Sequence, residues 1–257
     1  MSKKRKIISA GCLMLVCDMA QTPRREKGQA RAPRSRQTNP GQARCNQIRR
    51  ERDLELLLAA NFPVPGSAVV VTLTYDDRHL PKTVREAQRR LGYFRSKLRA
   101  ARKQAGLPEP RMIWCTEALS SASGRWHHHL VLDNTGEDLA MLRSCWIYGA
   151  EIEAEKLRVD DEKNHATLAR YMNKEKREAQ DYLSKPGQQA WSCSRNCKRP
   201  EVDVLTVDTG ARLRTPRGAT VLLHELRETE FGLYEIALFR LPFSAFRRPA
   251  RARRRFL

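Results

Sequence analysis

The sequence lacks long apolar runs and is poor in acidic residues. No stretch approaches the roughly 20 apolar residues that a membrane-spanning helix needs, so we expect no such helix. Aspartate and glutamate number 29 against 49 lysines and arginines, which gives a formal net charge of +20. Such a charge favours a polyanionic partner, nucleic acid first of all. A basic binding protein without any chemistry has the same composition, so charge alone does not exclude that class.

Paired cysteines are also missing. The seven cysteines are an odd number and lie far apart, which is typical of a reduced, cytoplasmic chain. Cys193 and Cys197 have no second pair to complete a zinc site, so we expect free thiols. Residues 3–17 imitate the charged and apolar parts of a secretory signal. The apolar run is short and no small-residue cleavage pattern follows it, so we expect no export.

Both ends of the chain are basic. Residues 22–50 are rich in Arg, Gln, Pro and Gly, and we predict a basic, disordered arm over residues 1–45. A helix is expected at about 46–60. Apolar patterns at 202–207, 219–223 and 234–241 predict a β extension over 201–246, and a basic tail follows at 247–257.

The middle of the chain alternates strands and helices. Strands are expected at 68–75, 111–117, 126–132 and 151–159, and helices from Thr83 to about 101, around 139–146 and at 164–180. Thr83 and Glu86 give the first of these helices a capping box. This order predicts an α+β fold with an antiparallel sheet of the split βαβ (ferredoxin- or RRM-like) type. We expect helices on one face of the sheet and a site on the other.

Two histidines on one strand form the strongest chemical signal. Side chains alternate along a strand, so His127 and His129 project to the same face about 7 Å apart and can reach one divalent ion. Glu117 ends the neighbouring predicted strand and is the best third ligand. The ordinary reading of a triple histidine is a solvent-exposed run, and Glu117 has a similar ordinary reading as a surface carboxylate.

A tyrosine and a lysine follow on a predicted helix. Tyr171 and Lys174 are three residues apart, on one side of that helix. A phenol beside an ammonium and a metal has what it needs to attack a phosphodiester. Core packing of the tyrosine ring is the ordinary reading, so the order and spacing of all these residues carry the argument.

These residues resemble the HUH endonucleases that initiate rolling-circle replication, especially the initiators of microviruses and of related bacterial plasmids, prophages and integrative elements. The resemblance covers about residues 46–200. It rests on Val71-Thr72-Leu73-Thr74-Tyr75, on Glu117 with Gly124-Arg125-Trp126-His127-His128-His129, on Tyr171-Met172-Asn173-Lys174, and on Trp191 with Ser194-Arg195-Asn196-Cys197-Lys198-Arg199-Pro200. His128 departs from the family pattern, in which the residue between the two histidines is usually hydrophobic.

The resemblance implies the HUH endonuclease fold and a nicking and joining reaction on single-stranded DNA at a replication origin. Tyr171 would be the nucleophile, forming a 5′-phosphotyrosyl intermediate, and Lys174 would stabilise the phenolate or hold a phosphate. His127, His129 and Glu117 would bind Mg²⁺ or Mn²⁺. The expected DNA-binding residues are Arg125, Thr72, Thr74, Arg170, Arg195, Lys198 and Arg199.

The expected setting is the cytoplasm of a bacterial host cell, where a phage or another mobile element replicates. The partners implied are single-stranded origin DNA, a host DNA polymerase and a host helicase, because no Walker-type phosphate-binding loop occurs in this sequence. No membrane partner is expected. The origin sequence and the oligomeric state stay open.

Two alternatives remain open. A transposase or a conjugative relaxase of the same superfamily would share the chemistry and differ in the DNA it recognises. A non-catalytic binding module built like an RNA-recognition domain would need aromatic side chains on its central strands, to stack bases. The first strand and the histidine strand offer only Tyr75 and Trp126 for this role.

Overall fold

The computed structural model describes residues 2–20, 40–117, 125–136, 138–160, 164–174, 190–229 and 232–242. The chain is α+β, as predicted, with two antiparallel five-stranded sheets that lie in two compact units. The first unit comprises residues 1–49, 162–164 and 199–257, and the second comprises residues 50–161 and 165–198. Within these described ranges no helix is both long and apolar enough to cross a membrane. The seven cysteines form no disulfide.

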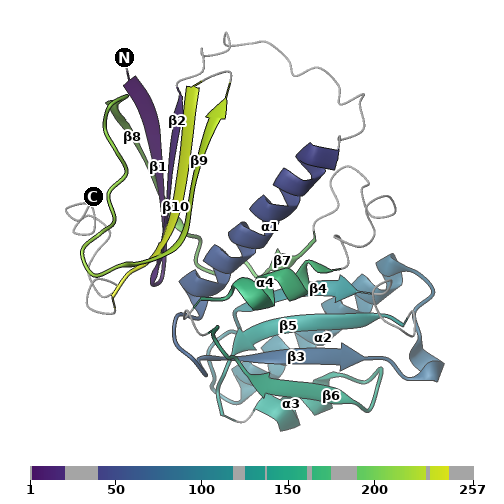
Figure 1. Ribbon diagram of the computed structural model, residues 1–257. Coiled ribbons are helices and arrows are strands. Elements are labelled where there is room, and N and C mark those ends of the chain that lie inside the picture. The colour runs from purple at the N-terminus through teal and green to yellow at the C-terminus, as the bar shows by residue number, and fades with distance from the viewer. Residues whose placement is uncertain are drawn as a thin grey trace, which may run out of the picture. The chain divides into compact units, whose positions relative to one another are not determined.

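The sheet of the second unit has the strand order β6-β3-β5-β4-β7 (Figure 1). Its strands are β3 (Ala68–Thr74), β4 (Met112–Glu117), β5 (His127–Asp133), β6 (Ile152–Lys156) and β7 (Ser192–Cys193). As the sequence predicted, β5 runs antiparallel to both β4 and β3 and lies between them. Two segments that are well separated in the sequence, β3 and β4, are thereby brought to either side of the histidine strand.

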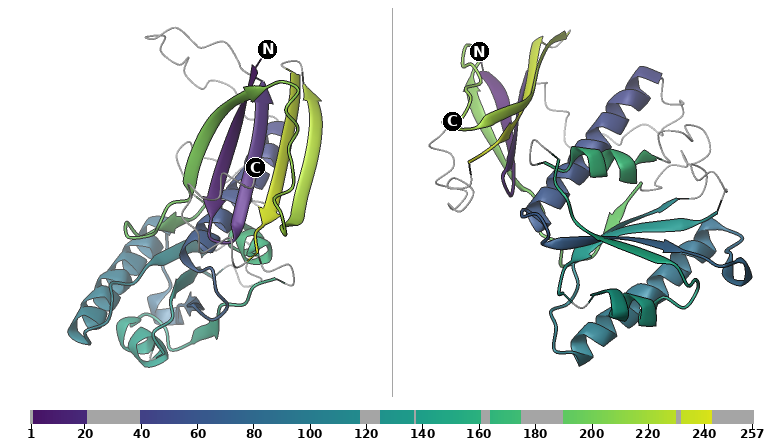
Figure 2. Two further views of the ribbon diagram at one scale, coloured as in Figure 1. Left: turned by 90° about the vertical axis from the view of Figure 1, so that its left-hand side faces the viewer. Right: turned by 60° about the horizontal axis from the view of Figure 1, so that its bottom comes forward.

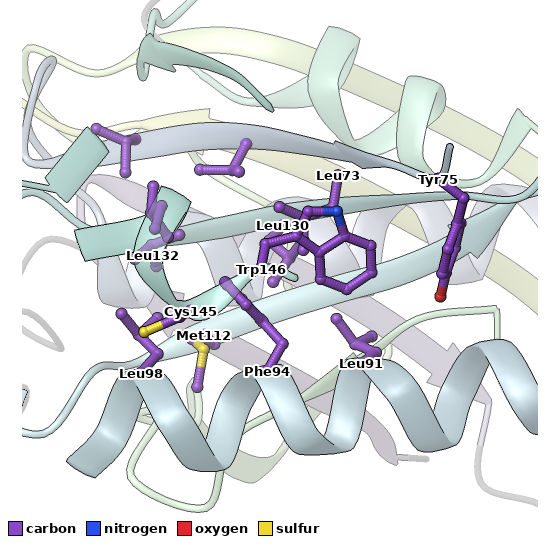
Figure 3. Packing of buried hydrophobic residues seen from close by; sticks show 13 residues of the cluster. Leu73, Tyr75, Leu91, Phe94, Leu98, Met112, Leu130, Leu132, Cys145 and Trp146 are labelled. Carbon is purple, nitrogen blue, oxygen red and sulfur yellow. The ribbon is translucent and has the colours of Figure 1, made fainter. Parts of the chain in front are cut away.

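Two helices cover one face of this sheet, namely α2 (Val84–Gln104) and α3 (Asp138–Cys145). Thr83 caps α2 by accepting a hydrogen bond from the backbone N–H of Glu86, as the capping box predicted. The apolar stripe of α2 then points at the sheet, where it meets side chains of β3, β4 and β5 and the Trp146 ring (Figure 3). The buried cluster on this face is Val69, Val71, Leu73, Tyr75, Leu91, Phe94, Leu98, Met112, Leu130, Leu132, Leu142, Cys145 and Trp146.

The opposite face carries helices as well, which corrects the prediction of helices on one face only. The C-terminal part of α1 (Pro40–Asn61) and α4 (Ala166–Met172) lie over it, as the right-hand view of Figure 2 shows. Leu54, Leu57 and Leu58 of α1 and Met172 of α4 pack there against Val131 of β5. The two helices bury one end of this face and leave the end near the histidines beside α4.

The first unit contains strands where the sequence predicted a disordered arm. β1 (Ser2–Ala10) and β2 (Leu13–Ala20) pair with each other, and the sheet order is β8-β1-β2-β10-β9. The predicted extension supplies the remaining strands, β8 (Glu201–Asp208), β9 (Thr220–Thr229) and β10 (Gly232–Arg240). The N-terminus and the extension therefore build one sheet together. Residues 21–39, the other part of the predicted arm, and the tail at 247–257 lie outside the described residues.

Candidate active site

The register of three strands puts the predicted site residues on one face of the second unit's sheet. His127 lies opposite Thr74 of β3 and Glu117 of β4, and His129 lies opposite Thr72. Cross-strand partners point to the same side of a sheet. The side chains of these five residues therefore share the face that α4 covers, which is the face that strand alternation predicted for the two histidines.

His128 points to the other face and is part of the core. It is fully buried, and its Nε2 lies 2.7 Å from the Tyr75 hydroxyl and its Nδ1 3.0 Å from Thr116 Oγ1. Burial lowers the pKa of His128 to about 3, with smaller contributions from the neighbouring histidines, so the ring is neutral at ordinary pH. A histidine replaces the usual apolar residue here because two hydroxyl groups satisfy its ring nitrogens.

His129 is the centre of a polar cluster that also contains Thr72, Glu117 and Tyr171. Its Nε2 lies 2.9 Å from Glu117 Oε2 and its Nδ1 lies 3.2 Å from Thr72 Oγ1. The Tyr171 hydroxyl of α4 is 3.4 Å from the same Nε2 atom, and the two rings meet edge to face with centroids 4.9 Å apart. The structure thus brings together a carboxylate, an imidazole and a phenol from three separate elements.

Tyr171 combines accessibility with a raised pKa. Its side chain is 45% exposed, so an extended ligand can reach the hydroxyl. Partial desolvation raises the pKa of Tyr171, and the negative charge of Glu117 and the nearby Cys115 and Glu153 raise it further. The phenol is therefore protonated at neutral pH, and its ionisation needs positive charge that the surrounding carboxylates do not provide.

Lys174 approaches the carboxylate of the cluster. Its Nζ lies 3.7 Å from Glu117 Oε1. We predicted Lys174 on the same helix as Tyr171, but α4 ends at Met172. Asn173 caps the helix, with its backbone N–H directed at Arg170 and Tyr171 carbonyls and its side chain donating to the Ala169 carbonyl. Lys174 therefore follows the cap, and Glu117 is its ion-pair partner.

His127 has the least satisfied side chain on this face. It is partly buried, and its Nδ1 has no hydrogen-bond partner among the residues that the structure describes. Desolvation lowers the pKa of His127, so its neutral, metal-binding form prevails. Two imidazoles and a carboxylate suit a divalent ion, and the unpartnered Nδ1 agrees with such a ligand. Nevertheless, no three such groups converge on one point within the described residues.

The predicted DNA-binding residues divide into engaged and exposed ones. Arg125 forms an ion pair with Asp77 at 2.6 Å and donates to the Tyr75 carbonyl, so it ties the start of β5 to the end of β3. Thr72 contacts His129, and Thr74 donates to the Glu151 carbonyl. The remaining four, Arg170, Arg195, Lys198 and Arg199, are exposed to solvent. Arg199 belongs to the first unit and the other three to the second.

Sequence reasoning missed one carboxylate of this face. Glu153 of β6 lies opposite Thr72 in register, so it projects to the same side as the histidines. It is exposed, and its negative charge acts on both His127 and Tyr171. The weak strand pattern at 151–159 could have located Glu153, but only the pairing of β6 with β3 reveals its neighbours.

Residues 68–176 match the family model of the replication-associated protein ORF2 type. The matched segment contains β3, β4, β5, β6 and α4, and with them the residues Glu117, His127, His129, Tyr171 and Lys174. Comparisons with curated proteins and with solved structures gave no significant match. The family match supports a replication-associated protein, and it covers the whole polar cluster around His129.

Proposed function

We propose that the protein is a replication initiator that nicks and rejoins single-stranded DNA at an origin of rolling-circle replication. The observation that carries this proposal is the position of the Tyr171 hydroxyl, 3.4 Å from His129 Nε2, which in turn lies 2.9 Å from Glu117. A nucleophile of the right chemical type thus stands beside the two residue types that hold a divalent ion. The similarity to replication-associated proteins over residues 68–176 agrees with it.

The chemistry is an in-line exchange of one phosphate ester for another. Tyr171 Oη forms a bond to phosphorus, and the bond from phosphorus to the 3′ oxygen breaks. The phenol loses its proton and the 3′ oxygen gains one, which leaves a free 3′ hydroxyl and a 5′-phosphotyrosyl ester. Because the ester keeps the energy of the phosphodiester, a later 3′ hydroxyl can reverse the exchange and join the strand.

The residues of the cluster divide the work. Tyr171 supplies the nucleophile, and its raised pKa keeps it protonated until substrate and positive charge arrive. His127, His129 and Glu117 would hold Mg²⁺ or Mn²⁺, which when bound would offset charge on the scissile phosphate. Lys174, 3.7 Å from Glu117, reduces the negative charge that would otherwise repel the phosphate backbone.

The proposal implies partners that the chain must meet. A nick needs single-stranded origin DNA, a helicase to expose it and a DNA polymerase to extend the 3′ hydroxyl. We propose that host enzymes supply the last two, in the cytoplasm of a bacterial cell. The exposed cations Arg170, Arg195 and Lys198 of the second unit are the proposed contacts to the strand beside Tyr171.

The test compares the wild type with Tyr171→Phe on single-stranded DNA taken from the region around its own gene, with Mn²⁺ or Mg²⁺. The phenylalanine keeps the ring beside His129 and removes only the attacking oxygen. We expect a covalent protein–DNA adduct on a denaturing gel for the wild type and none for the variant. Tyr234→Phe in the first unit serves as the matched control and should form the adduct at the wild-type rate.

Two outcomes would contradict the proposal. An adduct of equal yield with Tyr171→Phe would assign the nucleophile to another residue. Tight binding of origin DNA without any adduct, with either metal, would replace the enzyme by a basic nucleic-acid-binding protein. Mass analysis of a proteolysed adduct identifies the modified peptide in the first case.

A further inference from the structure

We propose that the solvent face of α2 is a second binding surface, which takes single-stranded DNA at a distance from Tyr171. The surface is defined by four residues, Arg85, Arg89, Tyr93 and Lys97, which we name the α2 row. Neither the nicking chemistry nor the metal is needed for this proposal, since it concerns binding alone.

The geometry of the α2 row follows from its spacing. Residues four apart lie on one side of an α-helix, and each step rises about 6 Å, so the row extends over about 18 Å. It faces away from the apolar stripe of Leu91, Phe94 and Leu98, which Figure 3 shows directed at the sheet. All four members of the row are exposed, and the Tyr93 side chain is 60% exposed.

The charges of the α2 row are available to a ligand. Within the described part of the chain, no carboxylate lies within ion-pair distance of Arg85, Arg89 or Lys97. The acidic residue of this helix, Glu86, makes its ion pair with Arg90 at 2.6 Å. Arg99, one turn beyond, differs from the row because Glu109 pairs with it at 2.7 Å.

The tyrosine decides which polyanion fits. Guanidinium and ammonium groups contact phosphates of any nucleic acid, but a large exposed aromatic ring on a helix has no use against a duplex, whose bases are stacked inside. An unpaired base can stack on such a ring, and this contact tolerates any sequence. Three cations around one exposed ring therefore fit a single strand that lies along the helix.

The position of the row separates it from the candidate active site. In the second unit, α2 and α3 lie on the face of the sheet opposite to α4, which carries Tyr171 (Figure 2). A strand on the α2 row and a strand at Tyr171 therefore do not compete for one surface. The row would hold a different segment of DNA from the one that is cleaved.

The experiment measures binding of a fluorescent oligothymidylate to the full chain by anisotropy, in the Tyr171→Phe background and with EDTA present. We expect Tyr93→Ala to weaken binding about five- to a hundredfold, which corresponds to the loss of one stacked base, and Tyr93→Phe to retain wild-type affinity. Arg89→Gln with Lys97→Gln should lower the slope of log affinity against log salt by about 0.7 for each lost contact. Arg99→Gln, on the same helix, should leave the slope unchanged.

Several results would overturn this inference. If Tyr93→Ala and the double variant bind as the wild type does, the α2 row is only a solvated face. If Tyr93→Phe loses as much affinity as Tyr93→Ala, the ring does not stack a base. If a DNA duplex loses as much affinity as the oligothymidylate, the surface reads phosphates alone. Because neither cleavage nor metal enters the assay, failure of the nicking proposal leaves the result intact.

Discussion

Glu153 adds a second carboxylate to the face that carries Tyr171. It lies opposite Thr72, one strand away from His129, and its charge contributes to the raised pKa of Tyr171. A carboxylate so placed attracts a divalent cation and repels a phosphate backbone. We therefore predict opposite effects of Glu153→Gln on the two ligands: weaker binding of Mn²⁺ and tighter binding of single-stranded DNA measured without metal. Each change should be about two- to fivefold, because the side chain is exposed and screened.

The matched control for this prediction is Glu155→Gln. Glu155 is exposed on the same strand and faces the same side, opposite Val70, but it lies about 7 Å farther along. It should change neither affinity by more than about half the effect of Glu153→Gln. Titration calorimetry with Mn²⁺ and anisotropy with DNA give the two values, and a parallel loss of both affinities would show that Glu153 has a structural role instead.

At the level of single residues, alternation predicted more than helical spacing did. The shared face of His127 and His129 follows from the period of a strand, which the pairing of β5 on both sides enforces. The relation of Lys174 to Tyr171 was predicted from helical spacing and was wrong, because the Asn173 side chain ends α4 by bonding the backbone. Glu153 could not be placed at all, since its neighbours depend on strand order.

Among the elements, β1 and β2 show how charge can disguise a strand. Lys3 and Arg5 occupy inward positions of β1 that apolar residues usually fill, and both are nearly buried. Asp18 of β2 neutralises them, with Arg5 bonding both carboxylate oxygens and Lys3 at 2.8 Å. In the sequence these residues look like an unstructured basic end, because a buried ion pair has no signature in a periodicity of hydrophobic residues.

Asp18 makes the stability of this sheet depend on pH. Burial acts to raise the pKa of the Asp18 carboxyl, but the hydrogen bonds from Arg5 and Lys3 outweigh it and hold the pKa below its ordinary value. A carboxyl with a lowered pKa stabilises the fold above its unfolded pKa of about 3.9 and loses that contribution as the pH falls through its folded pKa. Asp18→Asn should cost about 3–5 kcal/mol at neutral pH, since it leaves two buried cations without their counter-ion.

Urea unfolding of the full chain from pH 7 down to pH 3 measures this effect. The difference in midpoint between wild type and Asp18→Asn should be largest above about pH 5 and shrink below about pH 4, where the wild-type carboxyl takes up its own proton. Asp208→Asn, at the exposed end of β8, is the control and should shift no midpoint. A difference that stays constant over the whole pH range would mean that Asp18 is not ionised in the fold.

At the scale of the whole molecule, the order of elements was predictable from the sequence and their layering was not. The strands and helices of residues 68–172 appear where the patterns indicated. The cover on the second face was missed because Leu54, Leu57 and Leu58 belong to a helix that precedes the sheet, and no periodicity states which surface such a stripe will meet. Likewise, the strands on either side of residues 21–200 had to meet before their shared sheet could be recognised.

The positive charge of the molecule is spread away from the candidate active site. There, Lys174 lies beside Glu117 and Arg125 is paired with Asp77, whereas the chain as a whole carries a net charge of +20. We therefore expect most of the affinity for DNA to arise outside the polar cluster. Raising the salt from 50 to 200 mM should weaken binding of a single strand about a hundredfold, if about five phosphates are contacted.

Lys174→Ala separates affinity from chemistry in this respect. The variant should keep the salt slope of the wild type to within about 0.7, the value of one phosphate contact, while its yield of covalent adduct falls at least about tenfold. Anisotropy over a salt series and a denaturing gel give the two values on the same preparation. If the slope instead collapsed with Lys174→Ala, the few cations near Tyr171 would dominate binding, and the distributed charge would serve no role in holding DNA.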